Sequence, residues 1–136
     1  MIRKDYLVRK IEEFGKVLSR LHLLKRERQL DEFGEALVHA FNTFSPFEIS
    51  EFEALNEEEF SVRIIGNEHL TQEQFRILAD LIYEKMDHYS LTGNDSGAAK
   101  CRQKCIQLYQ KLLDDNVLGE FDLHAHYRLS SLMQNS

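Results

Sequence analysis

Proline is almost absent from this chain, and glycine is sparse. Pro46 is the single proline, and there are six glycines among 136 residues. Turn-rich β proteins use these residues to reverse the chain at short intervals, whereas long helices are interrupted by them. The sequence therefore predicts an all-α fold. We expect one domain over residues 1–136, because a chain of this length is typical of a single domain.

Apolar residues recur at helical spacing in the first 26 residues. At about 100° per residue they form one narrow stripe, which consists of Leu7, Ile11, Phe14, Leu18 and Leu21. We expect this stripe in the core, with Gly15 beside it where another helix approaches closely. Arg9, Lys16 and Arg20 point the other way. The alternative is a basic helix that contacts an anionic membrane or an acidic protein.

Further helices follow from apolar spacing and from capping patterns. A second stripe is formed by Leu30, Phe33, Leu37, Phe41 and Phe44. Capping boxes, in which a polar residue precedes Glu or Gln by three positions, are formed by Ser45 with Glu48, Asn56 with Glu59, and Thr71 with Gln74. We expect two short helices after Ser45 and after Asn56, then long helices near 72–90 and 96–114. Asp122 is expected to cap a last helix near 123–134.

Charge is spread unevenly along the chain. The net charge is -6, which makes nucleic-acid binding unfavourable. Residues 1–28 hold nine Lys or Arg against four Asp or Glu, a net +5, and the remainder sums to -11. Six glutamates lie between Phe47 and Phe60 with no basic residue among them. We hypothesise that these acidic short helices lie near the basic first helix, either within the chain or across a homodimer.

Two cysteines and two histidines near the end of the chain suggest a metal site. Cys101 and Cys105 are about 40° apart on a helix and could share an ion. However, they also occupy positions in the apolar stripe of the same helix, and free cysteine behaves as a small hydrophobe. His124 and His126 are about 200° apart if helical, so they cannot face one ion. We therefore predict buried, reduced cysteines and no metal.

Other candidate sites have a simpler structural interpretation. The stretch "GNDSGAAK" has three residues between its glycines, where a phosphate loop needs four, so it is interpreted as a turn between helices. The glutamates Glu48, Glu51, Glu53, Glu57, Glu58 and Glu59 alternate with apolar residues, which indicates a solvated face over a buried one. We assign no catalytic, cofactor-binding or metal-binding residue. The N-terminal segment lacks the apolar core of a signal peptide, and no stretch is long and apolar enough for a membrane span, so we expect a cytoplasmic protein.

One segment resembles a known helical repeat. The stretch "ADLIYEKMDHYSLTGNDSGAAKCRQKCIQLYQKLL" is similar to a tetratricopeptide-type hairpin, in which Tyr89 and Gly93 match the end of helix A and the turn, and Ala98 and Ala99 open helix B. "DEFGEAL" around Ala36 resembles a second helix B. The whole chain, from "DYLVRKIEEFGKVLSRL" on, resembles a family of uncharacterised bacterial proteins with a domain of unknown function. The resemblance implies tetratricopeptide-like hairpins of about four long helices with short connecting helices, and it brings no catalytic residues.

Two functions remain open from the sequence. The first is a non-catalytic helical scaffold that binds a protein or peptide partner, or a second copy of itself. The second is a small-ligand-binding protein or an enzyme with a pocket between the helical hairpins. A deep pocket with converging His, Glu or Tyr side chains would favour the second, and an apolar groove would favour the first.

Overall fold

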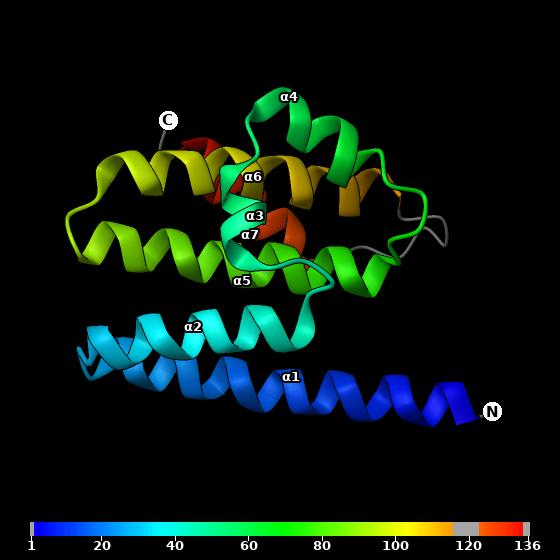
Figure 1. Ribbon diagram of the computed structural model, residues 1–136, viewed down its shortest axis with the longest axis horizontal. Helices are drawn as coiled ribbons and strands as arrows, with labels where there is room; N and C mark the ends of the chain where they lie inside the picture. The colour runs from blue at the N-terminus through cyan, green and yellow to red at the C-terminus, as the bar shows by residue number, and fades with distance from the viewer. Residues whose placement is uncertain (1, 116–122, 135–136) are drawn as a thin grey trace.

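The computed structural model describes residues 2–115 and 123–134, without the side chains of 2–5 and 7. Throughout these residues the regular structure is helical (Figure 1), which confirms the all-α prediction. The elements in order are α1 (Ile2–Arg26), α2 (Leu30–Phe44), α3 (Ile49–Ala54), α4 (Glu57–Phe60), the π-helical turn η1 (Ser61–Ile65), α5 (Gln72–Leu91), α6 (Asp95–Asp114) and α7 (Leu123–Gln134).

The long helices stack in antiparallel pairs. α1 packs on α2, α2 on α5 and α5 on α6, while α7 packs on α6 and also reaches α5 through His124 and Arg128 (Figure 1). The short helices α3 and α4 connect α2 to η1, and both α4 and η1 contact α6. α5 is therefore the central helix of the fold, since it has α2 on one side and α6 on the other. The positions of its polar residues decide which charges become buried.

The α5–α6 hairpin depends on glycine at one position. Gly93 adopts φ +82° in the turn, a left-handed conformation that glycine reaches without steric cost. The Asn94 side chain then caps α6 by accepting from the backbone N–H of Gly97. "GNDSGAAK" thus contains an interhelix turn, as predicted. Whether this hairpin is related to tetratricopeptide repeats stays a prediction.

Two of the three predicted capping boxes are confirmed. Asn56 with Glu59 begins α4, and Thr71 with Gln74 begins α5, with both reciprocal hydrogen bonds present in each. The prediction for Ser45 is wrong, because Ser45 terminates α2 and α3 begins only at Ile49. The Ser45 hydroxyl accepts from the Phe47 backbone N–H at 3.0 Å and forms a tight turn instead of a helix cap. Asp122, the expected cap of α7, lies outside the described residues.

The first helix enters the core later than its stripe predicts. Phe14 and Leu21 are buried and Leu18 is half-buried, but Ile11 is 51% exposed and is not a core residue. α1 has 25 residues and α2 only 15, and the end of α2 meets α1 where the Phe44 and Phe14 rings lie 5.3 Å apart. The part of α1 before Phe14 therefore extends past α2 (Figure 1). The Leu7 side chain lies outside the described residues.

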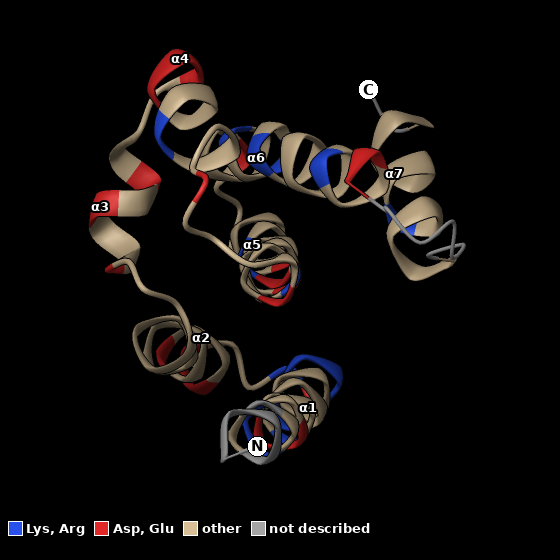
Figure 2. Ribbon diagram, turned by 90° about the vertical axis from the view of Figure 1, so that its right-hand side faces the viewer, with Lys and Arg blue, Asp and Glu red and all other residues tan. Residues whose placement is uncertain are grey.

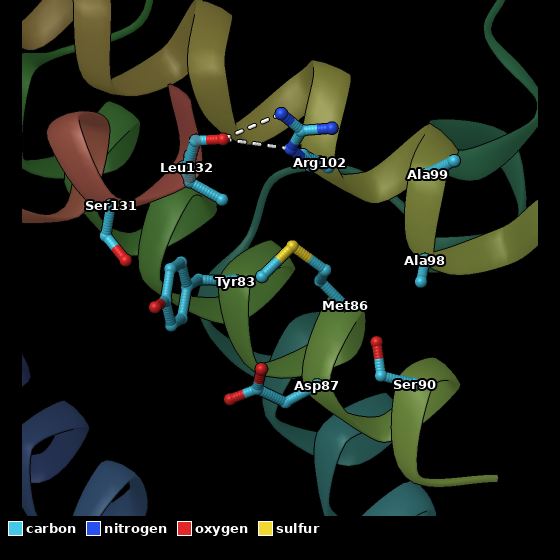
Figure 3. Close-up of a pocket in the computed structure, with 9 residues that line it drawn as sticks. All are labelled: Tyr83, Met86, Asp87, Ser90, Ala98, Ala99, Arg102, Ser131 and Leu132. Atoms are coloured by element: carbon cyan, nitrogen blue, oxygen red, sulfur yellow. Dashed lines mark hydrogen bonds between the residues drawn. The ribbon is translucent and has the colours of Figure 1, made fainter. Parts of the chain in front are cut away.

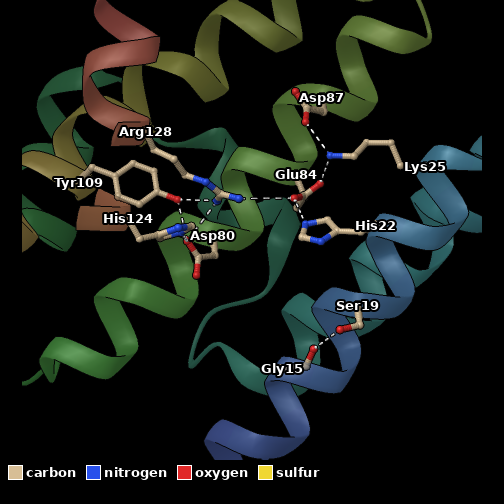
Figure 4. Close-up of polar contacts among 10 residues, drawn as sticks. All are labelled: Gly15, Ser19, His22, Lys25, Asp80, Glu84, Asp87, Tyr109, His124 and Arg128. Carbon is tan, nitrogen blue, oxygen red and sulfur yellow. Dashed lines mark hydrogen bonds and ion pairs between the residues drawn. The ribbon is translucent and has the colours of Figure 1, made fainter. Parts of the chain in front are cut away.

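Gly15 does not mark a close approach between helices. A Cβ atom at this position would meet no atom of another described element within 4 Å. The expectation of a neighbouring helix here is wrong for the same reason as for Ile11, since no described element of the chain faces this side of α1. The Gly15 carbonyl instead accepts the Ser19 hydroxyl at 3.1 Å, within α1 itself (Figure 4).

The acidic short helices lie far from the basic first helix within the chain. Figure 2 shows α4 at the opposite end of the molecule from α1, and α3 between α2 and α4, away from α1. An aromatic series fixes them there, because the Phe52 ring lies 5.2 Å from Phe41 and 5.3 Å from Phe60. Burial of such rings outweighs exposed ion pairs, which contribute about 0.2–1 kcal/mol each. The intrachain half of the charge hypothesis is therefore wrong, and the dimer half stays a hypothesis.

Candidate functional site

The central helix carries two buried carboxylates. Asp80 is 5% and Glu84 0% exposed, and they lie four residues apart, so they share one face of α5. Charged residues are almost never fully buried unless they are paired. These two carboxylates and the side chains that pair with them therefore form a polar site in the interior of the described residues.

Asp80 is held by side chains from α6 and α7. Its Oδ1 atom accepts from the Tyr109 hydroxyl at 2.7 Å and lies 3.1 Å from His124 Nε2 and 3.2 Å from Arg128 Nη1 (Figure 4). Arg128 Nη1 also donates to the Tyr109 hydroxyl at 2.8 Å. His124 and Arg128 are four residues apart, so α7 presents both to α5 from one face. The contacts fix α7 against the α5–α6 pair.

Glu84 is held mainly by α1. Its two oxygens lie 2.7 Å from His22 Nε2 and 2.7 Å from Lys25 Nζ, and Lys25 also bonds to Asp87 at 2.9 Å (Figure 4). Arg128 reaches the same carboxylate more distantly, at 3.9 Å. Arg128 therefore lies between the two carboxylates and connects the α7 contacts to the α1 contacts. We call this set the Asp80–Glu84 network; it comprises His22, Lys25, Asp80, Glu84, Asp87, Tyr109, His124 and Arg128.

The titration of Asp80 follows from these contacts. Burial by itself would raise the pKa of Asp80, but hydrogen bonds from His124 and Tyr109 outweigh burial. Together with the charge of Arg128 they lower the pKa below its ordinary value, so Asp80 is ionised at neutral pH. The pKa of Tyr109 shifts in the opposite direction. Burial and the negative charge of Asp80 raise the pKa of its hydroxyl well above the ordinary value, so it remains a neutral donor.

Lys25 remains charged for a related reason. Burial lowers the pKa of its ammonium group, but hydrogen bonds to Glu84 and Asp87 raise it by more. The Arg128 guanidinium lies 4.0 Å from the centre of the Tyr83 ring, a cation–π distance that favours the charged form in a partly apolar setting. Each cation in the network is thus paired with a carboxylate or an aromatic ring.

The network is chemically closed. Oδ1 of Asp80 and both oxygens of Glu84 are occupied by donors of this chain, and the Tyr109 hydroxyl both donates and accepts. Among the described residues, no serine or cysteine takes part in it as a nucleophile beside a base. Buried ion pairs of this kind specify how elements dock more than they add to stability. The arrangement therefore orients α1 and α7 on α5.

A cavity adjoins the network between α5, α6 and α7. It has a volume of about 320 Å³ and is lined by Tyr83, Met86, Asp87, Ser90, Ala98, Ala99, Arg102, Ser131 and Leu132 (Figure 3). Its one guanidinium, on Arg102, is held by two hydrogen bonds to the Leu132 carbonyl, at 3.0 and 2.8 Å. Asp87 is engaged by Lys25. Both charged groups of the lining are therefore already paired within the chain.

The structure separates the cysteines from the histidines. Cys101 and Cys105 are 3% and 0% exposed, which confirms their place in the core. Burial raises the pKa of the Cys101 thiol to about 12 and that of Cys105 well above its ordinary value. His124 faces Asp80, and His126 lies on the exposed side of α7. No group of three or more metal-binding side chains occurs in the described residues, and the metal-free state stays a prediction.

The acidic stretch is mostly a solvated face, as expected. Glu48, Glu51, Glu57, Glu58 and Glu59 are exposed, whereas Phe52 and Phe60 in the same stretch are buried. Glu53 is the exception, because its Oε2 atom accepts from the Tyr89 hydroxyl at 2.7 Å.

Sequence reasoning missed the residues that form the network. Asp80, Glu84, Tyr109 and Arg128 received no assignment from spacing or motifs. One signal was available: in "ILADLIYEKM", Asp80 and Glu84 interrupt the apolar stretch four residues apart, and "HAHYR" places His124 and Arg128 at the same spacing. Such matched pairs on two helices indicate carboxylates and cations that face each other.

No protein-family model, curated protein or solved structure matches the chain. Among the described residues, no helix has the length and apolar character that crossing a membrane requires.

Proposed function

We propose that the protein is a non-catalytic helical scaffold that binds an acidic helical segment of another protein through the first half of α1. The observation that carries the proposal is a pair of exposed apolar side chains on this half, in line with an exposed glycine. Val8 is 48% and Ile11 51% exposed, and with Gly15 they follow the spacing i, i+3, i+7. This is the spacing with which one helix contacts another along a single face.

The shape of this surface suits a helix. A Cβ atom added at Gly15 would meet no atom of another described element within 4 Å, so a partner backbone could approach α1 closely there. α1 also continues beyond the end of α2 (Figure 1), which leaves several turns without a partner among the described elements. Tyr6, 61% exposed, adds an aromatic group at the same end.

The charge around this surface favours an acidic partner. Arg9, Lys16 and Arg20 are exposed on α1 and outnumber the exposed Glu12 and Glu13 beside them, within a chain of net charge -6. Complementary charge steers association and selects partners more than it adds affinity. Apolar contacts at Val8 and Ile11 would therefore supply most of the binding energy. A second copy of this chain, through its acidic α3 and α4, and an anionic membrane are the competing occupants.

The closed polar network supports a scaffold over an enzyme. Its His, Glu and Tyr side chains are hydrogen-bonded within the network, so a substrate would have to compete with those contacts. In the cavity beside it, both charged groups of the described lining are paired within the chain. The alternative of a small-ligand-binding protein is better supported by a separate pocket on the opposite side of the α5–α6 hairpin, which is treated below.

The test compares the same substitution at two exposed apolar positions. Tagged wild-type protein, Ile11→Glu and the control Val62→Glu are purified from the native cell, and co-purified proteins are quantified. Val62 is 69% exposed on η1, so its substitution adds the same charge elsewhere. We expect one partner with an acidic helix to be retained by wild type and by Val62→Glu and lost with Ile11→Glu, and to bind again as purified protein.

Two other results would contradict this proposal. If purified wild-type protein alone forms a dimer by light scattering, and Ile11→Glu makes it monomeric, the occupant is a second copy. If wild type binds vesicles that contain anionic lipid and the Ile11→Glu variant does not, the occupant is a membrane. If all three proteins recover the same partners equally, this face of α1 is not the binding surface.

A further inference from the structure

A second pocket lies on the side of the α5–α6 hairpin that faces α3. It has a volume of about 230 Å³ and is lined by Glu53 of α3, Tyr89 of α5, and Asn94, Ser96, Gly97, Lys100, Cys101 and Lys104 from the beginning of α6. Gly97, Lys100, Cys101 and Lys104 follow helical spacing, so they line one face of α6. This pocket shares no residue with the Asp80–Glu84 network.

Lys104 is a buried cation without a counter-ion among the described residues. It is 6% exposed, and no carboxylate of the described chain lies within ion-pair distance of its ammonium group. The centre of the Phe60 ring lies 5.7 Å from its Nζ atom. Burial of most of the side chain disfavours its charged form and lowers the pKa of Lys104. A bound anion would supply the missing partner.

Glu53 presents an unused acceptor in the same pocket. Its Oε2 atom accepts from the Tyr89 hydroxyl at 2.7 Å, but its Oε1 atom is buried and has no hydrogen-bond partner among the described residues. Buried polar atoms in native proteins nearly always have a partner. Glu53 and Lys104 line one cavity without forming an ion pair. A ligand that donates to Glu53 and accepts from Lys104 would satisfy both.

The beginning of α6 adds positive character. α6 has 20 residues, and the first turn of a long helix carries about half a positive charge and backbone N–H groups without partners inside the helix. The Gly97 N–H already donates to the Asn94 side chain, which leaves the Ser96 N–H as the pocket-lining backbone donor for a ligand. Ser96 and Gly97 of that turn line the pocket, and Lys100 is one turn further along the same face. The lining side chains thus hold two ammonium groups and one carboxylate, together with a helix N-terminus.

We propose that this pocket binds a small oxyanion that also carries a hydroxyl group, such as hydrogen phosphate or a 2-hydroxycarboxylate. The anionic oxygens accept from the ammonium groups of Lys104 and Lys100 and from the backbone N–H of Ser96. The hydroxyl group donates to Oε1 of Glu53. An anion without a hydroxyl, such as sulfate, would place a bare oxygen against the Glu53 carboxylate, so Glu53 selects against it by repulsion. The site goes beyond the scaffold function and does not depend on it.

The experiment is a chemical-shift titration of ¹⁵N-labelled full chain at constant ionic strength. Sodium phosphate is compared with sodium sulfate, and sodium lactate with sodium propionate, because each pair differs by the hydroxyl donor. We expect saturable shifts of the Ser96 and Gly97 amides with at least one hydroxyl-bearing anion and markedly weaker binding of its matched anion. The tighter binding of phosphate or of lactate shows whether the ligand is a phosphate or a 2-hydroxycarboxylate.

Three variants test the roles of the lining residues. Lys104→Met keeps the length of the side chain and removes the charge, and it should weaken binding by about tenfold or more. Glu53→Gln should abolish the preference for the hydroxyl-bearing anion. Lys100→Gln should weaken binding less than Lys104→Met, and it provides a second variant if Lys104→Met does not fold. Lys16→Met, on the remote face of α1, is the control and should bind like wild type.

A thermal melt of the ligand-free proteins separates binding from folding. Lys104→Met should be at least as stable as wild type without ligand, because a buried unpaired charge has been removed. The proposal is overturned if neither phosphate nor lactate produces saturable shifts at the start of α6. It is also overturned if sulfate and propionate bind as well as their hydroxyl-bearing counterparts, or if Lys104→Met binds as wild type does.

Discussion

Replacement of Glu84 by glutamine should destabilise the protein by about 2–3 kcal/mol. Removing one partner of a buried ion pair typically costs about 3–5 kcal/mol, because the other charge is left uncompensated. Here the cost is smaller, since the Lys25 side chain is 26% exposed and keeps its 2.9 Å contact with Asp87. The His22 side chain is 50% exposed and regains water. The new amide N–H₂ group would also face an ammonium donor.

Urea unfolding followed by circular dichroism measures this loss. With a slope of about 1–3 kcal/mol per molar urea, the midpoint should fall by about 1 M or more while the slope stays constant. Glu58→Gln is the matched control, because Glu58 is exposed on α4, and it should change the free energy of unfolding by less than about 0.5 kcal/mol. A Glu84→Gln variant as stable as this control would refute the assignment of the network to helix docking.

Three further outcomes can be measured in the same way. Phe14→Ala should cost about 3–5 kcal/mol of unfolding free energy because the ring is buried, whereas Ile11→Ala should cost less than about 0.5 kcal/mol. Equal costs would contradict the finding that α1 packs on the core only from Phe14 onward. Cys105→Ser should cost about 1–2 kcal/mol by burying a hydroxyl, and a neutral result would contradict its core position. The stability difference between wild type and Asp80→Asn should be largest at neutral pH and should disappear in acid. The folded pKa of Asp80 lies below its ordinary value of 3.8, so its contribution is present above pH 3.8 and is lost as the pH falls through the folded pKa; a pH-independent difference would contradict this sign.

Local patterns in the sequence identified most helices because their causes are local. The boxes of Asn56 and Thr71 are made within four residues, and each begins a helix as predicted. The same pattern at Ser45 does not begin a helix, because the Ser45 hydroxyl accepts from the Phe47 backbone N–H in a turn instead. Periodicity located the α1 stripe but not its buried length, because that length depends on where α2 ends. Ile11 was therefore placed in the core in error.

The polar site could not be predicted because its contacts are long-range. Lys25 and Glu84 are 59 residues apart in sequence, and Asp80 and Arg128 are 48 apart. Spacing within α5 identifies which face Asp80 and Glu84 share, but not which helix covers that face. Net charge likewise could not predict which elements lie side by side. It predicted attraction between α1 and the acidic helices, whereas the burial of Phe52 and Phe60 determined their position.

Crosslinking from position 11 in the native cell tests the central claim most directly. A photoreactive phenylalanine derivative replaces Ile11 in one strain and Val62 in another, and the crosslinked peptides are identified after irradiation. The account predicts that position 11, and not position 62, crosslinks to one acidic helical segment of another protein. Crosslinking from position 11 that does not exceed that from position 62 would contradict the claim that the exposed face of α1 is the binding surface.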